Sequence, residues 1–220
     1  MKSFEESLRE AVSFHGEECP GQVIGTRMAM IGCREIGLEH PRSEGERKKI
    51  IVYVEMDRCA ADAVMAVTGC RIGKRTLKIM DYGIMAATFV NLETGRAVRV
   101  RARESSRALA VRYAPDVEEK YLRQSEAYKV MPEEELFEIT EVRVTIPVQD
   151  MPGRPVQRVR CESCGEWVQD MKEVKVNGRV LCRPCGLGGY FEKERKESSD
   201  AIRNDRSGKD GRQYRSAPDA

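Results

Sequence analysis

The eight cysteines of this 220-residue chain fall into two groups, and this division constrains the fold more than any other feature. Near the C-terminus stand two CxxC pairs, Cys161 with Cys164 and Cys182 with Cys185. The other four are scattered through the first third of the chain: Cys19, Cys33, Cys59 and Cys70. The two groups predict two modules with different chemistry.

The paired cysteines predict one closed zinc site. Structural Zn²⁺ takes four ligands in a tetrahedron, and each CxxC turn brings two thiolates to one ion. Seventeen residues separate the pairs, which suits a short hairpin, and Asn177-Gly178 is a preferred type I′ turn. Gly165 and Gly186 each follow a pair and favour a sharp turn around the metal. We expect a treble-clef-like or zinc-ribbon-like module of structural role; a disulfide or redox pair is the alternative.

Composition sets the expected domains and excludes some classes. We predict a core domain over residues 1–147, a Pro- and Gly-containing linker over 148–158, a zinc module over 159–190 and a disordered tail over 191–220. The 38 basic and 36 acidic residues give a net charge of +2, which is no argument for nucleic acid. No apolar run approaches the roughly 20 residues that span a bilayer, and the start does not resemble a signal peptide. We therefore expect a cytoplasmic protein without a membrane partner.

The core is predicted to be α+β, with helices packed on a mostly antiparallel sheet. Hydrophobic periodicity predicts helices over 4–12, 20–38, 60–68, 105–113 and 116–128, and strands over 49–56, 77–81, 86–92, 97–102, 139–146. Gly25 and Gly32 lie on nearly one face of the second helix. They either admit another backbone closely or are two tolerated helical glycines.

Three residues of the core domain are candidate ligands of a second metal. His15 and Cys19 form an H-x3-C pair at the junction of two helices. Cys59 stands at the predicted start of a helix, where the helix dipole and free backbone N–H groups favour a thiolate. The alternatives are a loop histidine bonded to backbone and buried structural thiols, and for Cys33 and Cys70 we favour the structural role.

Four residues of the same region are candidate catalytic groups. A thiolate, two acids and a phenol are the types that such chemistry needs, here Cys59, Asp62, Asp81 and Tyr82. Asp62 lies within one helical turn of Cys59, although a first-turn acid also suits the helix dipole without any catalytic role.

Several stretches together resemble one known family. They are FHGEECPGQVIGTRMA from Phe14, VEMDRCAADAVMAVTGCRIGKRTLKIMDYGIMAATF from Val54, and the terminal CESCGE and LCRPCG. In this order the chain resembles the formylmethanofuran dehydrogenase E-subunit family from Phe14 to Cys185. The resemblance implies an α+β core, often a dimer with exchanged helices, and a zinc finger on its C-terminal side. It places the family's pocket at His15, Cys19, Cys59, Asp62, Asp81 and Tyr82.

The family is associated with molybdenum or tungsten formylmethanofuran dehydrogenases, which reversibly fix CO₂ on methanofuran. This chain departs from the common His-Gly-His-x-Cys-Pro-Gly pattern, because Glu17 stands where the second histidine would be. A carboxylate is a harder ligand than imidazole, so the departure leaves the identity of the second metal open.

Three hypotheses follow. The first is a metal-binding, non-catalytic component, expected as a homodimer, that docks on a molybdopterin-type oxidoreductase; no Rossmann, P-loop or ferredoxin pattern occurs. The second is a stand-alone metal- or thiolate-dependent enzyme at His15, Cys19 and Cys59, with Asp62 or Tyr82 moving protons. The third and weaker is a nucleic-acid-binding zinc protein, which the mixed charges around the cysteine pairs disfavour.

Overall fold

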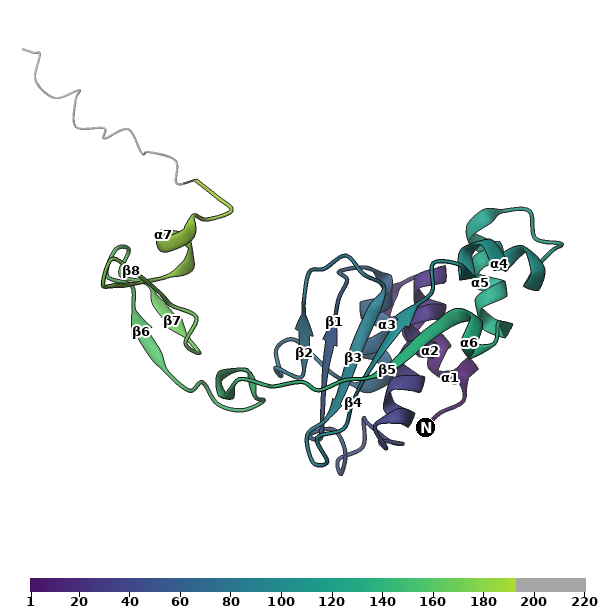
Figure 1. Cartoon of the computed structure of the whole chain (residues 1–220), viewed down its shortest axis with the longest axis horizontal. Coiled ribbons are helices and arrows are strands. Elements are labelled where there is room, and N and C mark those ends of the chain that lie inside the picture. The colour runs from purple at the N-terminus through teal and green to yellow at the C-terminus, as the bar shows by residue number, and fades with distance from the viewer. Residues whose placement is uncertain (193–220) are drawn as a thin grey trace, which may run out of the picture. The chain divides into compact units, whose positions relative to one another are not determined.

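The computed structural model of the chain describes residues 1–192, which divide into two compact units (Figure 1). The first unit comprises Met1–Arg158 with Gln169–Met171, and the second comprises Val159–Val168 and the described residues from Lys172 onward. All but the first two residues of the tail expected from 191 lie outside the described residues. Within residues 1–192, no helix has the length and apolar character needed to cross a membrane.

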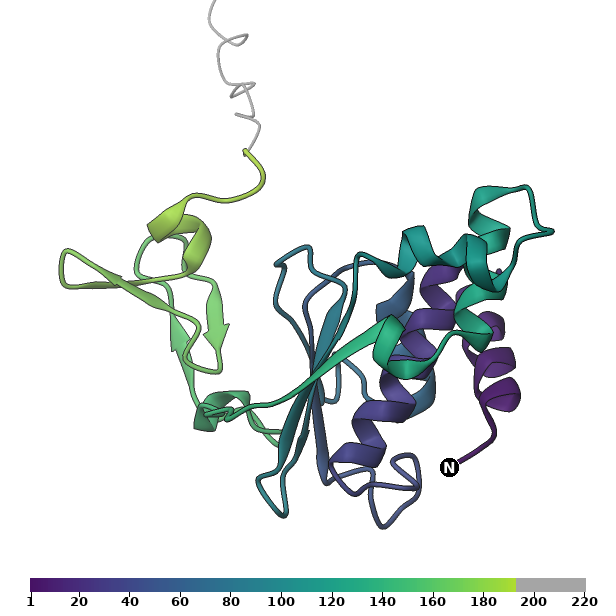
Figure 2. The same cartoon turned by 45° about the vertical axis from the view of Figure 1, so that its right-hand side comes forward.

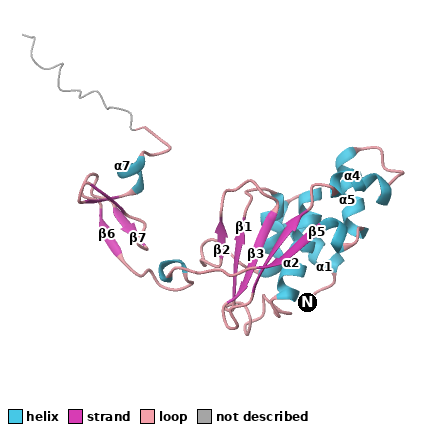
Figure 3. Ribbon diagram, in the orientation of Figure 1, coloured by secondary structure: helices cyan, strands magenta, loops and turns pink. Residues whose placement is uncertain are grey.

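The first unit contains one five-stranded sheet of order β2-β1-β3-β4-β5 (Figure 3). Its strands are β1 Ile50–Val54, β2 Leu77–Ile79, β3 Ala86–Asn91, β4 Ala97–Ala102 and β5 Phe137–Glu141. Three neighbouring pairs are antiparallel and only β1 and β2 are parallel. The predicted α+β fold with a mostly antiparallel sheet is therefore confirmed.

The helices of this unit lie on one face of the sheet, as Figure 2 shows with the sheet nearly edge-on. They are α1 Phe4–His15, α2 Pro20–Glu35, α3 Cys59–Thr68, α4 Ser106–Tyr113, α5 Lys120–Val130 and α6 Glu133–Leu136. Helix α3 connects the two parallel strands, since a parallel pair needs a crossover rather than a hairpin.

Local sequence explains where the helices at the site begin and end. The Ser3 side chain accepts from the Glu6 N–H in a capping box that starts α1. Gly16 ends α1 in the left-handed conformation, with φ of 109°, and Pro20 occupies the first turn of α2. Gly69, with φ of 73°, ends α3. Short caps therefore fix the junctions between these helices.

Gly25 and Gly32 admit close neighbours, which decides between the two roles considered for them. A Cβ on Gly25 would lie 2.5 Å from the carbonyl oxygen of Ala60, so α3 packs directly on the backbone of α2. A Cβ on Gly32 would lie 2.1 Å from the ring of Phe89 on β3. These two contacts set the separation of α2 from α3 and from the sheet.

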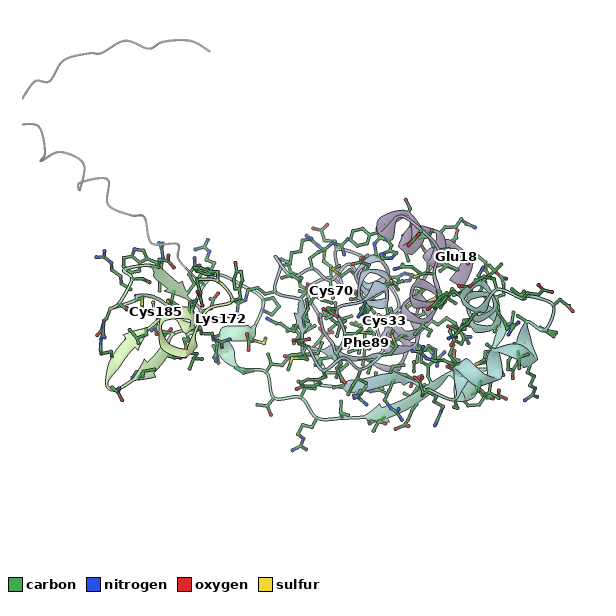
Figure 4. The ribbon with its side chains drawn as sticks, turned by 90° about the horizontal axis from the view of Figure 1, so that it is seen from above. Glu18, Cys33, Cys70, Phe89, Lys172 and Cys185 are labelled. Carbon is green, nitrogen blue, oxygen red and sulfur yellow. The ribbon has the colours of Figure 1, made fainter. Side chains whose placement is uncertain are left out.

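Cys33 and Cys70 are core residues, as predicted, with 0% and 1% of their surfaces exposed. Figure 4 shows both in the interior of the first unit, together with Phe89. Burial raises the pKa of each thiol above its ordinary range, because the protein interior disfavours the thiolate. Neither sulfur is suited to metal binding or nucleophilic attack.

Several predicted boundaries were wrong. The strand expected over 139–146 is β5 and ends at Glu141, because its partner β4 begins at Ala97 and leaves nothing opposite the later residues. The helix expected to reach Leu38 ends at Glu35, before Gly37 with φ of 74°. Helix α5 starts at Lys120, where the Glu119 carboxylate caps it, rather than at Asp116.

After β5 the chain leaves on the face of the sheet opposite the helices (Figure 2). A short 3₁₀ turn, η1, covers Val148–Asp150, and Asp150 lies 3.8 Å from Nζ of Lys78 on β2. The segment therefore crosses from one edge of the sheet to the other. On the same face Arg99 donates two hydrogen bonds, of 2.7 and 2.6 Å, to the buried carboxylate of Glu55.

The second unit holds the paired cysteines. Its elements are β6 Arg158–Arg160, β7 Trp167–Gln169, β8 Val174–Val176, β9 Arg179–Leu181 and α7 Arg183–Leu187. The predicted β8–β9 hairpin is confirmed, and Asn177 and Gly178 have the positive φ of a type I′ turn, 51° and 79°. The β6–β7 pair was not predicted.

Candidate metal centres

The structure brings His15, Cys19 and Cys59 together, with their ligand atoms all within 4.8 Å of one another. The three residues come from three helix ends. His15 is the last residue of α1, Cys19 is the N-cap of α2, and Cys59 is the first residue of α3. Two thiols and an imidazole form a donor set that suits Zn²⁺ and other borderline ions.

The surroundings of Cys19 act on its thiol in two directions. Burial raises the pKa of Cys19 above its ordinary value, while backbone N–H groups of the first turn of α2, at Gln22 and Gly21, lower it. The neighbouring Cys59 thiol raises the pKa further, because two thiolates repel each other. A cation between the two sulfurs would remove this repulsion, and binding it would release a proton.

Asp62 orients His15. Its Oδ2 lies 2.8 Å from Nδ1 of the ring, and Asp62 stands one helical turn after Cys59 on α3. When Nδ1 carries the proton and donates to this carboxylate, the lone pair of Nε2 remains for a metal. Carboxylate-oriented histidine is the common outer arrangement of protein metal sites. The structure thus gives Asp62 a positioning contact.

Gln22 is a further residue of the site, which the sequence did not indicate. Its side chain is fully buried, and Nε2 donates a 2.6 Å hydrogen bond to the backbone carbonyl of Cys59. The bond ties the first turn of α2 to the first turn of α3. A buried glutamine three residues after Cys19 has no sequence signal, because its partner is a main-chain atom 37 residues away.

A cavity of about 610 Å³ opens beside the two thiols. Cys19 and Cys59 lie at its wall together with Arg58, which precedes α3, and residues from α4 and α5. Cavities of this size commonly bind small molecules.

The remaining predicted pocket residues lie elsewhere. Asp81 and Tyr82 follow β2 on an exposed loop, and Tyr82 is 62% exposed. Neither residue makes a hydrogen bond or ion pair within residues 1–192, and neither lines the cavity. Glu17 is also exposed and stands outside the group of three converging ligands. The carboxylate that the structure brings to the site is Asp62.

The second cluster gathers the four paired cysteines, whose sulfurs also lie within 4.8 Å of one another. Cys164 and Cys182 are 3.7 Å apart at sulfur, and tetrahedral Zn–S bonds of about 2.3 Å imply about 3.8 Å. The backbone N–H groups of Cys164 and Cys182 point at the Cys161 sulfur and lower its pKa to about 6. The donor set and spacing fit one zinc ion.

The two glycines after the pairs have different roles. Gly165 has φ of 78° and turns the chain, as predicted. Gly186 lies in α7 without positive φ, so the predicted turning role was wrong there. A Cβ at this position would lie 2.4 Å from Cγ2 of Val174, and the glycine lets α7 pack on the β8–β9 hairpin.

Comparison with known proteins agrees with this architecture. Residues 14–138 match the family described as FmdE, Molybdenum formylmethanofuran dehydrogenase operon. A crystal structure of an FmdE-like protein of tungsten formylmethanofuran dehydrogenase from Syntrophus aciditrophicus shares the fold. Its TM-score is 0.57 at 20% identity, covering 87% of this chain and 96% of that one.

A curated protein of Archaeoglobus fulgidus, named a probable S-adenosyl-L-methionine-binding protein, is 31% identical over 203 residues. The match covers 84% of this chain and 53% of the relative, so the chain spans about half of that protein's length. The family match covers more than half of the chain, including all three converging ligands of the first unit. The chain belongs to the FmdE family.

Proposed function

We propose that this protein is a metal-binding accessory subunit of a molybdenum or tungsten formylmethanofuran dehydrogenase, or of a related molybdopterin oxidoreductase. Family membership supports the association with that enzyme. The convergence of His15, Cys19 and Cys59 carries the metal-binding part of the proposal. The four paired cysteines hold a second ion, zinc, whose role is structural.

The two centres differ in what they offer a ligand. Four cysteines fill the coordination of a tetrahedral ion, whereas two thiolates and an imidazole leave one position. The cavity is lined by both thiols of the three-residue centre, so a small molecule or a partner's side chain in the cavity would meet that position. When bound, the ion would supply Lewis acidity there, and Asp62 would keep the His15 ring oriented.

Metal analysis tests the proposal directly. The Cys161→Ser variant should lose the zinc of the paired cysteines and keep one equivalent of metal. The Cys161→Ser, Cys59→Ser double variant should retain none. Cys33→Ser is the matched control, because this thiol lies in the core and away from both clusters. Zero residual metal in Cys161→Ser would remove the metal centre from the proposal.

The partner is tested separately. Purification of the tagged native protein from its own cells, followed by mass spectrometry, should recover molybdopterin oxidoreductase subunits. Recovery of the protein as a homodimer without such subunits would contradict the accessory role and leave the metal result intact.

A second candidate function is a stand-alone enzyme that works at the same centre. It is favoured by the cavity at the two thiols and by Asp62 within hydrogen-bond distance of His15. The name of the Archaeoglobus relative makes S-adenosyl-L-methionine the first small molecule to test. Calorimetric titration should detect binding that Cys59→Ser or Gln124→Ala weakens; no heat at any metal loading would exclude this ligand.

A further inference from the structure

The cavity beside Cys19 and Cys59 is lined by an excess of positive charge. Three arginines face it, Arg58, Arg103 and Arg107, against one acid, Glu104. Glu104 has 83% of its side chain exposed, and its 3.0 Å pair with Arg107 is a surface ion pair of little strength. The cationic lining is therefore only weakly neutralised by the protein itself.

Two of these arginines are placed differently. Arg58 directly precedes Cys59, and its side chain makes no hydrogen bond or ion pair in the described part of the chain. Arg103 is held in place, because its Nε donates to the backbone carbonyls of Glu134 and Phe137. One guanidinium beside the thiols is thus unpaired and another is fixed before any ligand binds, an arrangement that suits recognition of a carboxylate or phosphate group.

The rest of the wall supplies apolar contact and a few polar side chains. Ile24, Met85 and Ala102 give aliphatic surface, and Tyr128 is buried with 1% of its surface exposed. Gln124 adds an amide on α5. A ligand that fits has an anionic group, an apolar body and one end near sulfur.

We propose that this cavity binds a small organic anion and presents it to the centre formed by His15, Cys19 and Cys59. The proposal deepens the proposed metal-binding function, because it names the class of molecule that reaches the centre. Opposite charge in a walled cavity also raises the local concentration of anions, so the same lining should favour anionic reagents over neutral ones.

Alkylation of the two thiols tests this without requiring a bound metal. Iodoacetate and iodoacetamide are similar in size and leaving group but differ in charge. In each case the thiolate sulfur forms a bond to the methylene carbon, the C–I bond breaks, and iodide leaves. Rates at Cys19 and Cys59 are measured in the chelator-treated full chain by peptide mass spectrometry, with N-acetylcysteine as the reference thiol.

The ratio of the iodoacetate rate to the iodoacetamide rate should be about tenfold higher at Cys59 than for N-acetylcysteine at low salt. It should fall at least about fivefold in Arg58→Gln with Arg107→Gln. Arg112→Gln removes the same charge from the same helix as Arg107, outside the cavity, and should change nothing. Circular dichroism verifies that each variant is folded.

A ratio equal to that of N-acetylcysteine, or an equal loss in Arg112→Gln, would overturn the proposal. The outcome is independent of metal content. A chain that purifies without metal at the three-residue centre but keeps the tenfold ratio would remove the proposed metal function and leave the anion site.

Discussion

The two cysteine clusters are built in opposite ways. The four-cysteine cluster takes all its ligands from a short local stretch, in which two CxxC turns flank a hairpin. The three-residue cluster takes one ligand from the end of α1 and one from the start of each of α2 and α3. Metal binding creates the fold around the first cluster, whereas packing of the core creates the second.

The comparison separates structural from reactive chemistry. A tetrahedral ion with four thiolates has no free position, and its loss should be felt as unfolding. The three-residue cluster has a cavity, an oriented histidine and unpaired positive charge around it. Reactivity is expected where the ligands are dispersed and the coordination is incomplete.

The largest expected effect is on the four-cysteine cluster. Cys161→Ser should lose one zinc and unfold the second unit, because structural zinc contributes about 10–16 kcal/mol of apparent binding free energy. Hydrogen exchange should show loss of amide protection from Val159 onward and unchanged protection in α2 and β3. Ser163→Ala retains all four sulfurs and is the control. Protected β8 and β9 amides in zinc-free Cys161→Ser would contradict the comparison.

Gly25→Ala should be next in size and should affect the other cluster. The new methyl group meets the Ala60 backbone, which cannot move as a flexible side chain would, at a cost of about 3 kcal/mol. Moving α3 also moves Cys59, so metal affinity at the three-residue cluster should fall while the zinc of the paired cysteines stays. Chemical denaturation and metal competition measure both, and Gly45→Ala, in open space, is the control. An unchanged affinity would mean that helix packing does not set this centre.

Asp62→Asn should weaken metal binding at the three-residue cluster by about 10–100-fold, because the ring of His15 loses its charged partner. Cobalt spectra with a competing chelator give the affinity. Asp57→Asn, an exposed neutral substitution beyond the helix start, should have no such effect. Equal affinity in Asp62→Asn and the native chain would reduce Asp62 to a first-turn acid.

The smallest effect concerns a cysteine in neither cluster. Burial raises the pKa of Cys33, so the folded state keeps its proton while the unfolded thiol loses it near pH 8.5, roughly. The stability from this difference is complete below the unfolded pKa and declines as pH rises above it, by about 1.4 kcal/mol per pH unit at most.

The Cys33→Ala variant should therefore lose stability less steeply, by about 1 kcal/mol between about pH 9 and pH 10. Urea unfolding at several pH values measures the two slopes. Parallel slopes for the variant and the native chain would show that this thiol is not the source of alkaline destabilisation.

Local patterns could be predicted from the sequence and distant pairings could not. β4 was predicted with both bounds correct, and the turn at Asn177-Gly178 follows from backbone preference alone. By contrast, the contact of His15 with Asp62 spans 47 residues, and the bond from Gln22 ends on a carbonyl. Such contacts depend on how α1, α2 and α3 pack, which periodicity does not specify.

The placement of Asp81 and Tyr82 illustrates the same limit. Their proximity to the centre was an implication of family resemblance, and in the structure both stand on the exposed loop after β2. The strand β2 is short and its pairing with β1 is parallel, so no hairpin register fixes where the following loop lies. Residues held by caps and helix packing were brought together, and residues on a free loop were not.

The ends of the five-stranded sheet limit how the chain associates with others. Unpaired strand edges are templates for addition of further strands, and proteins protect them with short length and charge. The edge strand β2 has only three residues, with Lys78 at its middle, and the other edge strand, β5, carries Glu138 and Glu141. Sheet extension is therefore disfavoured at both edges, and association with other proteins is directed to surfaces formed by side chains rather than by free backbone groups.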